Sequence, residues 1–279
     1  MPAEELQTLG VTQAPLFIQF PQGEVNSADI TADQFYDRLE AMRPVIPTTA
    51  QPSNGIFAAL YRKLAQTDKN ILSLHISSGL SGTINAANGG AEEAAPQAQV
   101  KVWDTMTLSG GERFQVLLAA LAAKAGWTIE AIQQRLAEIR AQTEVVYTLE
   151  TLEYLARGGR IGRVKALAGS LLNLKPVIHV EHSDGKYSTV STARTMTKAL
   201  QAITDHLHGL YAGAPLWVTV LHGRAADKAD LLADKLRETL NVARLEVMRI
   251  SPVLGVHTGP GIVGAAILPM SLAQDLLKT

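Results

Sequence analysis

The first half of the chain alternates between short apolar runs and helical stripes. The apolar runs predict strands at 14–20, 71–76 and 100–103. Apolar residues at helical spacing predict helices over 31–42, 53–64, 83–95 and 109–125, and another that begins after Thr128. Strands that alternate with helices in this way favour a Rossmann-like parallel sheet with helices on both faces.

Capping residues support these helix starts. Thr31 and Gln34 have the spacing of a capping box. Ser53, Ser109 and Thr128 each stand where a predicted helix begins, and their short side chains can accept a hydrogen bond from a free backbone N–H. We therefore expect these helices to begin at their capping residues.

The pattern changes near Glu144. Beyond it, strands are expected at 145–149, 174–180, 187–190, 216–221, 243–250 and 262–268, and helices over 151–157 and 226–240. The dipeptide Asp184-Gly185 lies between two of these strands and is a strong hairpin signal. Hairpins mixed with helices predict a mixed or antiparallel sheet. We therefore expect two α/β domains, residues 1–143 and 144–279, that pack directly and share a cleft.

Composition narrows the classes of function. The 279 residues are 47% hydrophobic and 18% charged, a balance typical of globular proteins. With 25 basic and 26 acidic residues, the net charge of -1 argues against a nucleic-acid binder that works by bulk charge. The absence of cysteine excludes disulfides, zinc–thiolate sites and a cysteine nucleophile, and it fits a cytosolic protein.

Neither a membrane span nor a secretory signal is visible in the sequence. The longest apolar region, 114–125, contains Gln115 and Lys124 and is far shorter than the ~20 apolar residues of a spanning helix. The N-terminus carries Glu4 and Glu5 and lacks a basic segment followed by an apolar core. We expect a cytoplasmic protein without stable membrane insertion.

Two hydroxyl-rich segments could carry chemistry. The loop at 47–53 is restricted by two prolines, so it either presents Thr49 to a polar ligand or is a helix-capping turn that ends at Ser53. The segment 77–83 follows a buried strand and opens a helix. Its free N–H groups, with Ser81 and Gly82, suit a carboxylate or phosphate, although a simply capped helix start has the same composition.

Two later segments are also ambiguous. The basic segment 157–165 is either an exposed loop that meets a phosphate or an acidic partner, or a helix C-terminus finished by glycine. The segment 255–261 is predicted to be a Gly/Pro-rich turn between two strands. Its His257 could donate to a carboxylate or act as a base, or it is an ordinary loop histidine.

Metal-ligand residue types also occur beside the predicted hairpin. Strand alternation places His179 and Glu181 on one face, and His182 follows them. The three residues lie beside the predicted hairpin turn. We therefore expect no metal there.

Taken together, these segments resemble the DegV family of fatty-acid-binding proteins, also called FakB. The loop at 47–53 is close to the family's P-T-T-S-Q-P-S, and 75–83 matches its H-I-S-S-x-L-S-G-T. The segments 152–161 and 172–176 resemble L-x-Y-L-x-x-G-G-R-I and L-L-N-I-K-P, and 257–261 resembles H-T-G-P-G. The order agrees, and the resemblance covers nearly the whole chain.

The resemblance implies a two-domain α/β carrier without chemistry of its own. In the family, one long-chain fatty acid lies with its tail in an apolar tunnel and its carboxylate near the domain interface. On this sequence the matching carboxylate ligands are Thr49, Ser81, Gly82 and His257. The resemblance implies no catalytic residue, no metal and no cofactor, with the fatty acid as the ligand.

A partner protein is implied as well. Family members present the carboxylate to a fatty acid kinase subunit, FakA, which uses ATP to make an acyl-phosphate for phospholipid synthesis. The present sequence has no Walker A motif. By analogy, Arg160, Arg163 and Arg194 are candidates for docking a FakA-like kinase.

The start of the sequence departs from the family. Members usually open with a strand that ends in a T-D-S-T/S-A-D-L-like turn, whereas this sequence begins in a segment that resembles the following helix. The expected first strand is missing, which suggests a start codon assigned downstream or a truncated chain. A central strand that is lost leaves backbone groups to be satisfied in another way.

Two other hypotheses remain open from the residues alone. The first is an enzyme that acts on a small phosphorylated or carbonyl substrate with Ser81 and His257, although no acidic residue is obviously placed to orient the histidine. The second is a regulatory or interaction protein whose functional surface is the basic segment 157–165.

Overall fold

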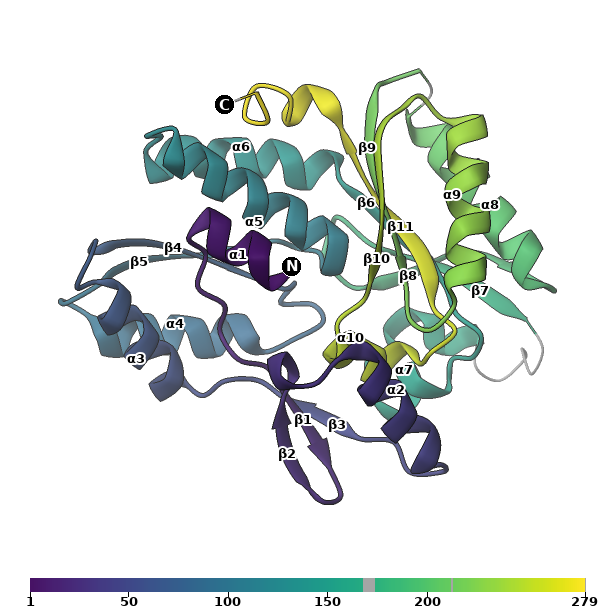
Figure 1. Ribbon diagram of the computed structural model, residues 1–279, viewed down its shortest axis with the longest axis horizontal. Coiled ribbons are helices and arrows are strands. Elements are labelled where there is room, and N and C mark those ends of the chain that lie inside the picture. Colours follow the sequence, from purple (N-terminus) through teal and green to yellow (C-terminus); the bar gives the residue numbers. More distant parts are fainter. Residues whose placement is uncertain (168–173, 212, 279) are drawn as a thin grey trace.

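The structure is a computed structural model that describes residues 1–167, 174–211 and 213–278 (Figure 1). Its strands are β1 (Phe17–Phe20), β2 (Gly23–Asn26), β3 (Thr48–Ala50), β4 (Asn70–His75), β5 (Gln99–Asp104), β6 (Glu144–Thr148), β7 (Lys175–Val180), β8 (Tyr187–Ala193), β9 (Leu216–His222), β10 (Val242–Arg249) and β11 (Val263–Pro269). Its α-helices are α1 (Ala3–Leu9), α2 (Ala32–Ala41), α3 (Asn54–Leu64), α4 (Thr83–Ala94), α5 (Ser109–Lys124), α6 (Ile129–Gln142), α7 (Glu153–Arg157), α8 (Met196–Tyr211), α9 (Ala226–Thr239) and α10 (Pro252–Thr258). Short 3-10 turns, η1 (Ser27–Asp29), η2 (Gly162–Leu167) and η3 (Met270–Leu272), complete the described elements.

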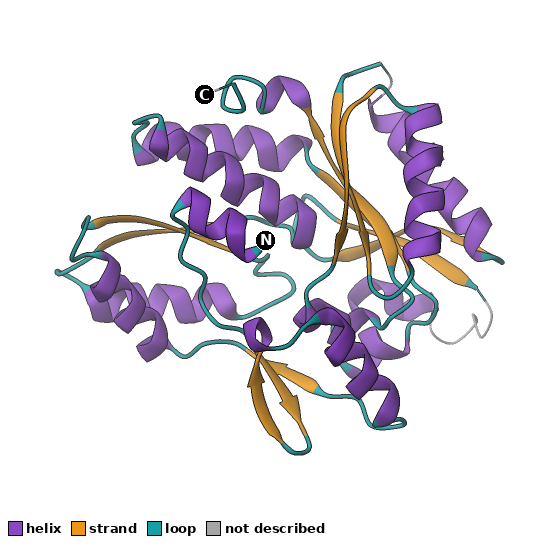
Figure 2. Cartoon of the chain, viewed as in Figure 1, coloured by secondary structure: helices purple, strands orange, loops and turns teal. Residues whose placement is uncertain are grey.

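The largest sheet has six strands in the order β10-β9-β11-β6-β7-β8. Its β9 and β10 are parallel, and its other neighbours are antiparallel, so the mixed sheet predicted for the second half is confirmed. Helices α5 and α6 cover one face, and α8 and α9 cover the other (Figure 2). Because both faces are covered, β9 and β11 are buried along their whole length.

The parallel sheet predicted for the first half is confirmed as the pair β4 and β5, in register from Asn70 opposite Gln99 to His75 opposite Asp104. Helix α4 packs on both strands and against α3. Helix α5 contacts β4 as well as β11, so it lies between the parallel pair and the six-stranded sheet (Figure 1).

The predicted strand at 14–20 is shorter, and it does not join the parallel pair. It forms β1 in a separate antiparallel sheet of order β2-β1-β3. Its Ile18 is fully buried whereas Gln19 is exposed, which is the alternation of a sheet covered on one face only. Strands β2 and β3 are short and polar, so their sequences carried no strand signal.

Most predicted helix starts are confirmed. Thr31 and Gln34 form both bonds of a capping box, and the Oγ atoms of Ser53 and Thr128 each accept a backbone N–H from the first turn. The prediction for Ser109 is wrong. Leu108 takes the capping position of α5, and Ser109 is the first helical residue with a φ of 52°.

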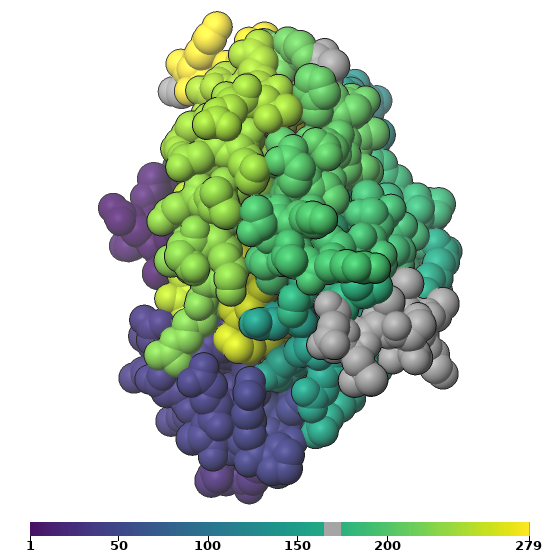
Figure 3. All heavy atoms as spheres, turned by 90° about the vertical axis from the view of Figure 1, so that its right-hand side faces the viewer, coloured from purple at the N-terminus to yellow at the C-terminus, as the bar shows by residue number. Residues whose placement is uncertain are grey.

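Helix α8 was not expected from the sequence. Its buried residues Ala199, Leu200, Ile203 and Leu207 fall at helical spacing, so an amphipathic signal was present. The space-filling view in Figure 3 looks onto α8 and α9, whose green and yellow-green side chains cover that face above the blue and purple N-terminal segments.

The boundary between residues 143 and 144 stays a prediction. The six-stranded sheet begins at Glu144, but α5 and α6 from the first half pack on it.

A buried arginine on α5 forms ion pairs with α1 and β10. Arg113 on α5 is 7% exposed, and its guanidinium binds Glu5 on α1 through Nε–Oε2 (2.9 Å) and Nη2–Oε1 (2.7 Å). Its Nη1 also donates to Oε1 of Glu246 on β10 (2.7 Å). The same Glu246 oxygen accepts a hydrogen bond from Trp217 Nε1 on β9 (2.8 Å). Removal of the arginine would leave two partly buried carboxylates without their counter-ion.

We expect Arg113→Met to lower the free energy of unfolding by about 3 kcal/mol, because breaking one side of a buried ion pair costs more than the pair itself contributes. Urea denaturation followed by circular dichroism measures this. The control is Arg237→Met, which removes an exposed pair with Asp234 and is expected to cost less than about 1 kcal/mol. Equal losses in both variants would contradict a stabilising role for the Arg113 network.

Candidate functional site

A cavity of about 1700 Å³ opens between α1, α3, β4 and α5. Aliphatic side chains from these four elements line it, including Leu6, Leu9, Leu60, Leu64, Leu72 and Val116. The volume exceeds the roughly 300–1,000 Å³ of an ordinary small-molecule pocket. Three of the predicted ligands, Thr49, Ser81 and His257, line this same cavity.

Thr49 and His257 are in direct contact. Thr49 Oγ1 lies 2.9 Å from His257 Nε2, although the residues are 208 positions apart in the chain. Thr49 is held by β3, where it pairs with Ile18 of β1. His257 lies in the last turn of α10, which contacts β3. Packing of α10 on this small sheet therefore brings the two side chains together.

The prediction that His257 lies in a turn between strands is wrong. It belongs to α10, which begins after Ser251 with Pro252 in the first turn and ends at Gly259 with a φ of 73°. Proline is compatible with a first helical turn because its missing N–H needs no partner there. The Gly/Pro-rich signal therefore marked both ends of a short helix.

The imidazole of His257 is neutral at physiological pH. The side chain is 8% exposed, and burial lowers its pKa from 6.5 to about 4, with the positive charge of Arg160 acting in the same direction. Its Nδ1 is buried and has no hydrogen-bond partner among the described residues. Gly158 leaves room for the ring, because a Cβ there would lie 2.3 Å from Nδ1.

The turn at 77–83 packs on the proline-flanked loop. Ser81 Oγ lies 2.7 Å from Thr83 Oγ1 and accepts a hydrogen bond from the Thr83 backbone N–H (3.3 Å). Gly82 is the capping residue of α4 and does not itself line the cavity. A Cβ at Gly82 would lie 2.8 Å from Oε1 of Gln51, so a larger residue there would displace the end of the Gln51 side chain.

The hairpin between β7 and β8 supports this turn from the other side. The predicted Asp-Gly hairpin is confirmed, and Ser77 Oγ donates a hydrogen bond to the carbonyl oxygen of Gly185 (2.8 Å). A Cβ at Gly79 would lie 2.4 Å from the carbonyl oxygen of Asp184. Close backbone packing thus fixes the turn against the second half of the chain.

Among the three arginines predicted to dock a partner, the structure places Arg160 in the cavity wall. Its Nη1 donates to the carbonyl oxygen of Gly158 (2.6 Å), and its Nε donates to that of Leu80 (3.4 Å). Arg163 is exposed and forms an ion pair with Asp184. Arg194 is exposed just after β8. Neither Arg163 nor Arg194 lines the cavity.

A row of three hydrogen-bonded polar side chains in the cavity wall was not predicted from the sequence. Tyr61 OH lies 2.8 Å from Ser73 Oγ, which in turn lies 2.8 Å from His75 Nε2. All three residues line the cavity. His75 is a buried, hydrogen-bonded histidine: it is 6% exposed, and burial lowers its pKa to about 4. Alternation along β4 puts Ser73 and His75 on one face, so this signal was available.

Ser81 and His257 do not form a nucleophile–base pair among the described residues. The hydroxyl of Ser81 is engaged by Thr83, and His257 Nε2 is engaged by Thr49. The pKa of about 4 makes the histidine a weak base at neutral pH. The arrangement offers neutral and cationic donors to a ligand instead. It suits an anionic group at the edge of an apolar cavity.

A family model described as "Uncharacterised protein, DegV family" matches residues 1–270. The chain belongs to the DegV family. A DegV domain-containing protein of Deinococcus radiodurans is 36% identical over 260 residues, covering 93% of this chain and 89% of that protein. One from Streptomyces coelicolor is 35% identical over 270 residues, covering 96% of this chain and 94% of that protein.

Solved structures of DegV proteins share the fold. A structure described as fatty acid binding of a DegV family protein from Thermus thermophilus has a TM-score of 0.89 and 32% identity, and the match covers 96% of this chain and 95% of that one. DegV from Bacillus subtilis, described as a fatty acid binding protein, has a TM-score of 0.87 and 26% identity, with the same coverage. The two-domain α/β fold expected for this DegV chain is therefore confirmed.

Leu172 and Asn173 of the motif at 172–176 lie outside the described residues. In the part of the chain that the structure describes, no helix is both long enough and apolar enough to cross a bilayer.

The lowered pKa of His257 has a consequence for stability. Between its folded pKa of about 4 and its unfolded value near 6.5, the unfolded chain binds a proton that the folded protein does not, so stability falls as pH drops through this window. We expect His257→Gln to reduce the loss of unfolding free energy between pH 7 and pH 4 by about 3 kcal/mol. Urea titrations across this range measure the difference.

The exposed His208 provides the control. His208→Gln should leave the pH profile of the wild-type protein unchanged, because His208 lies on the surface of α8 and does not line the cavity. If the unfolding free energy falls as steeply between pH 7 and pH 4 in His257→Gln as in the wild type, the fold does not hold this histidine neutral.

Proposed function

We propose that this protein binds one long-chain fatty acid in the cavity and acts as a carrier. The carboxylate ligands would be Thr49, Ser81, Gly82 and His257, with Arg160 as an additional cation. Related DegV structures from Thermus thermophilus and Streptococcus agalactiae are described as fatty acid binding, at 32% and 27% identity. The observation that carries the proposal is the Thr49–His257 pair in the wall of a large cavity that aliphatic side chains line in part.

The two ends of a fatty acid make opposite demands. Each buried CH2 of the tail contributes about 0.8 kcal/mol, so an aliphatic cavity supplies most of the affinity. The carboxylate loses its hydration and needs donors that are already in place. Thr49 and His257 supply a hydroxyl and a neutral imidazole that hold each other in position, and Arg160 supplies positive charge beside them.

The sharpest test removes one donor without changing side-chain shape. Thr49→Val keeps the β-branched volume and deletes the hydroxyl. A hydrogen bond to a charged group contributes about 1.5–3 kcal/mol, so we expect the affinity for palmitate to fall about 10- to 100-fold. Displacement of a fluorescent fatty acid measures this change. The affinity for methyl palmitate, which has no charge to hold, should not change by more than about twofold.

Thr192→Val is the matched control, because Thr192 is an exposed strand threonine on β8 and does not line the cavity. It should bind palmitate like the wild type. If Thr49→Val keeps full affinity for palmitate, or if it weakens acid and ester equally, the assignment of the head-group site is wrong.

We further propose that the bound carboxylate is presented to a FakA-like fatty acid kinase. In that reaction a carboxylate oxygen attacks the γ-phosphorus of ATP, the bond to the leaving ADP oxygen breaks, and an acyl-phosphate forms. The exposed Arg163 and Arg194 are the proposed docking residues on this carrier. Support for this step comes from the family resemblance and from the exposure of both side chains.

Charge reversal tests the docking proposal. We expect Arg163→Glu with Arg194→Glu to reduce palmitate-dependent ADP release by a FakA-like kinase at least about 10-fold, through loss of electrostatic attraction at the interface. Palmitate affinity should stay unchanged, because neither residue lines the cavity. Arg237→Glu on α9 is the control for net charge. Full kinase activity in the double variant would exclude these two arginines as docking residues.

A further inference from the structure

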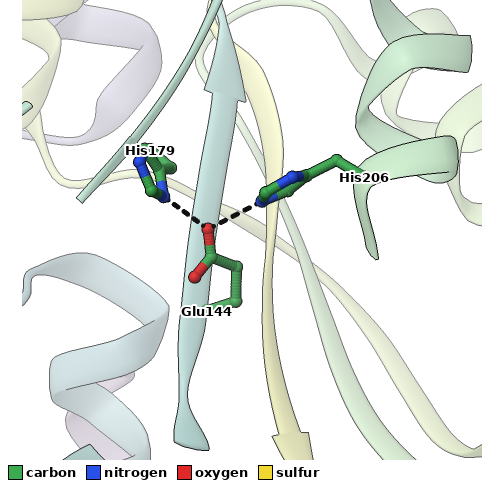
Figure 4. Close-up of side chains that lie close together, drawn as sticks. All are labelled: Glu144, His179 and His206. Atoms are coloured by element: carbon green, nitrogen blue, oxygen red, sulfur yellow. Dashed lines mark hydrogen bonds and ion pairs between the residues drawn. The ribbon is translucent and has the colours of Figure 1, made fainter. Parts of the chain in front are cut away.

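A second cluster of functional side chains lies away from the cavity. Glu144 on β6, His179 on β7 and His206 on α8 converge on one point, and none of them lines the cavity (Figure 4). One carboxylate oxygen, Glu144 Oε1, lies 2.8 Å from His179 Nδ1 and 3.0 Å from His206 Nε2. Figure 4 shows the two imidazoles pointing at this oxygen from two sides.

The fold itself brings these three residues together. In the antiparallel pairing of β6 with β7, Val146 lies opposite His179. Since side chains two positions apart share a face, Glu144, Val146 and His179 all point toward the same side of the sheet. That side is the one covered by α8, where Val146 packs among the buried residues of the helix. His206 reaches the cluster from this helix.

We propose that Glu144, His179 and His206 form a binding site for a divalent transition-metal ion of the zinc class. Two imidazole nitrogens and a carboxylate oxygen are a ligand set that such ions prefer over Mg²⁺ or Ca²⁺. The three ligand atoms lie within 4.8 Å of one another. Tetrahedral zinc places its ligand atoms about 3.3 Å apart, so small side-chain rotations bring the three atoms around an ion.

Further charged and polar groups lie beside the proposed ligands. Glu181 Oε2 lies 3.7 Å from Nε2, the other ring nitrogen of His179, so a carboxylate lies beside the ring that presents Nδ1. His182 Nε2 lies 3.4 Å from the second carboxylate oxygen of Glu144 and 2.9 Å from the carbonyl oxygen of Thr143. Each oxygen of the Glu144 carboxylate therefore has a histidine nitrogen nearby.

Burial and access also fit an ion. The Glu144 side chain is only 4% exposed, and a carboxylate removed from water is stabilised by a nearby cation. His179 and His206 are each about one-fifth exposed, at 19% and 21%, so an ion can enter from solvent. An ion held here would connect β6, β7 and α8. The sequence analysis expected no metal beside the hairpin. The local sequence there does not indicate that Glu144 and His206, which are distant in the chain, lie next to His179.

Zinc titration of chelator-treated protein tests the proposal. Isothermal titration calorimetry is expected to show one Zn²⁺ per chain in the wild type and no binding of Mg²⁺ at the same concentration. Zn²⁺ should also raise the melting temperature, because a ligand that binds only the folded protein stabilises it. His206→Ala should weaken Zn²⁺ binding at least about 10-fold.

His208→Ala is the matched control, because His208 is an exposed histidine on the same helix, outside the cluster. It should bind Zn²⁺ like the wild type. If His206→Ala folds poorly, Glu144→Gln gives the same test with an isosteric side chain. Co²⁺ serves as a visible probe of the same site. Its absorption should report tetrahedral coordination in the wild type and should be lost in His206→Ala and in Glu144→Gln.

Three results would overturn the proposal. The first is a wild-type protein that binds no Zn²⁺. The second is binding that is equally strong in the wild type, His206→Ala and Glu144→Gln, which would identify adventitious surface sites. The third is a loss of binding in His208→Ala as large as that in His206→Ala. The outcome is independent of fatty acid binding, because the cluster and the cavity share no residue.

Discussion

The hydrogen bond between Thr49 and His257 joins two segments that are 208 residues apart, and the geometry of the proposed head-group site depends on it. Both partners lie in short elements. Thr49 lies on a three-residue strand, and His257 lies in the last turn of a two-turn helix. Only the packing of α10 on the small antiparallel sheet places both side chains at the same point in the cavity wall. The site is therefore a product of tertiary packing between the two halves of the chain.

Electrostatics follow from the same packing. Because α10 is buried, the imidazole of His257 stays neutral, and the one cation in its immediate electrostatic surroundings among the described residues is Arg160. A neutral donor and a nearby positive charge can hold a carboxylate without placing two cations side by side in an apolar cavity. Gly158 contributes by leaving space that any larger residue would take from the ring. Within the segment 158–160, Gly158 therefore leaves space for the imidazole and Arg160 supplies the positive charge.

Much of this could be predicted from local signals. The capping box at Thr31 and the hairpin at Asp184-Gly185 depend on residues close together in sequence, and both are confirmed. The parallel pairing of β4 with β5 follows from the alternation of strands and helices and is confirmed as well. Predictions failed where long-range packing decides. Strands β2 and β3 carry no apolar pattern, and the direction of the Arg160 side chain into the cavity depends on Leu80, which is eighty residues away. The Glu144 cluster was missed for the same reason, since its members come from three elements.

Extraction of the purified protein with organic solvent, followed by quantitative lipid mass spectrometry, tests the central claim most directly. The account predicts close to one long-chain fatty acid per chain, because an aliphatic cavity with a preorganised anion site retains its ligand through purification. Absence of fatty acid in the extract, together with no binding of added palmitate or oleate, would contradict it.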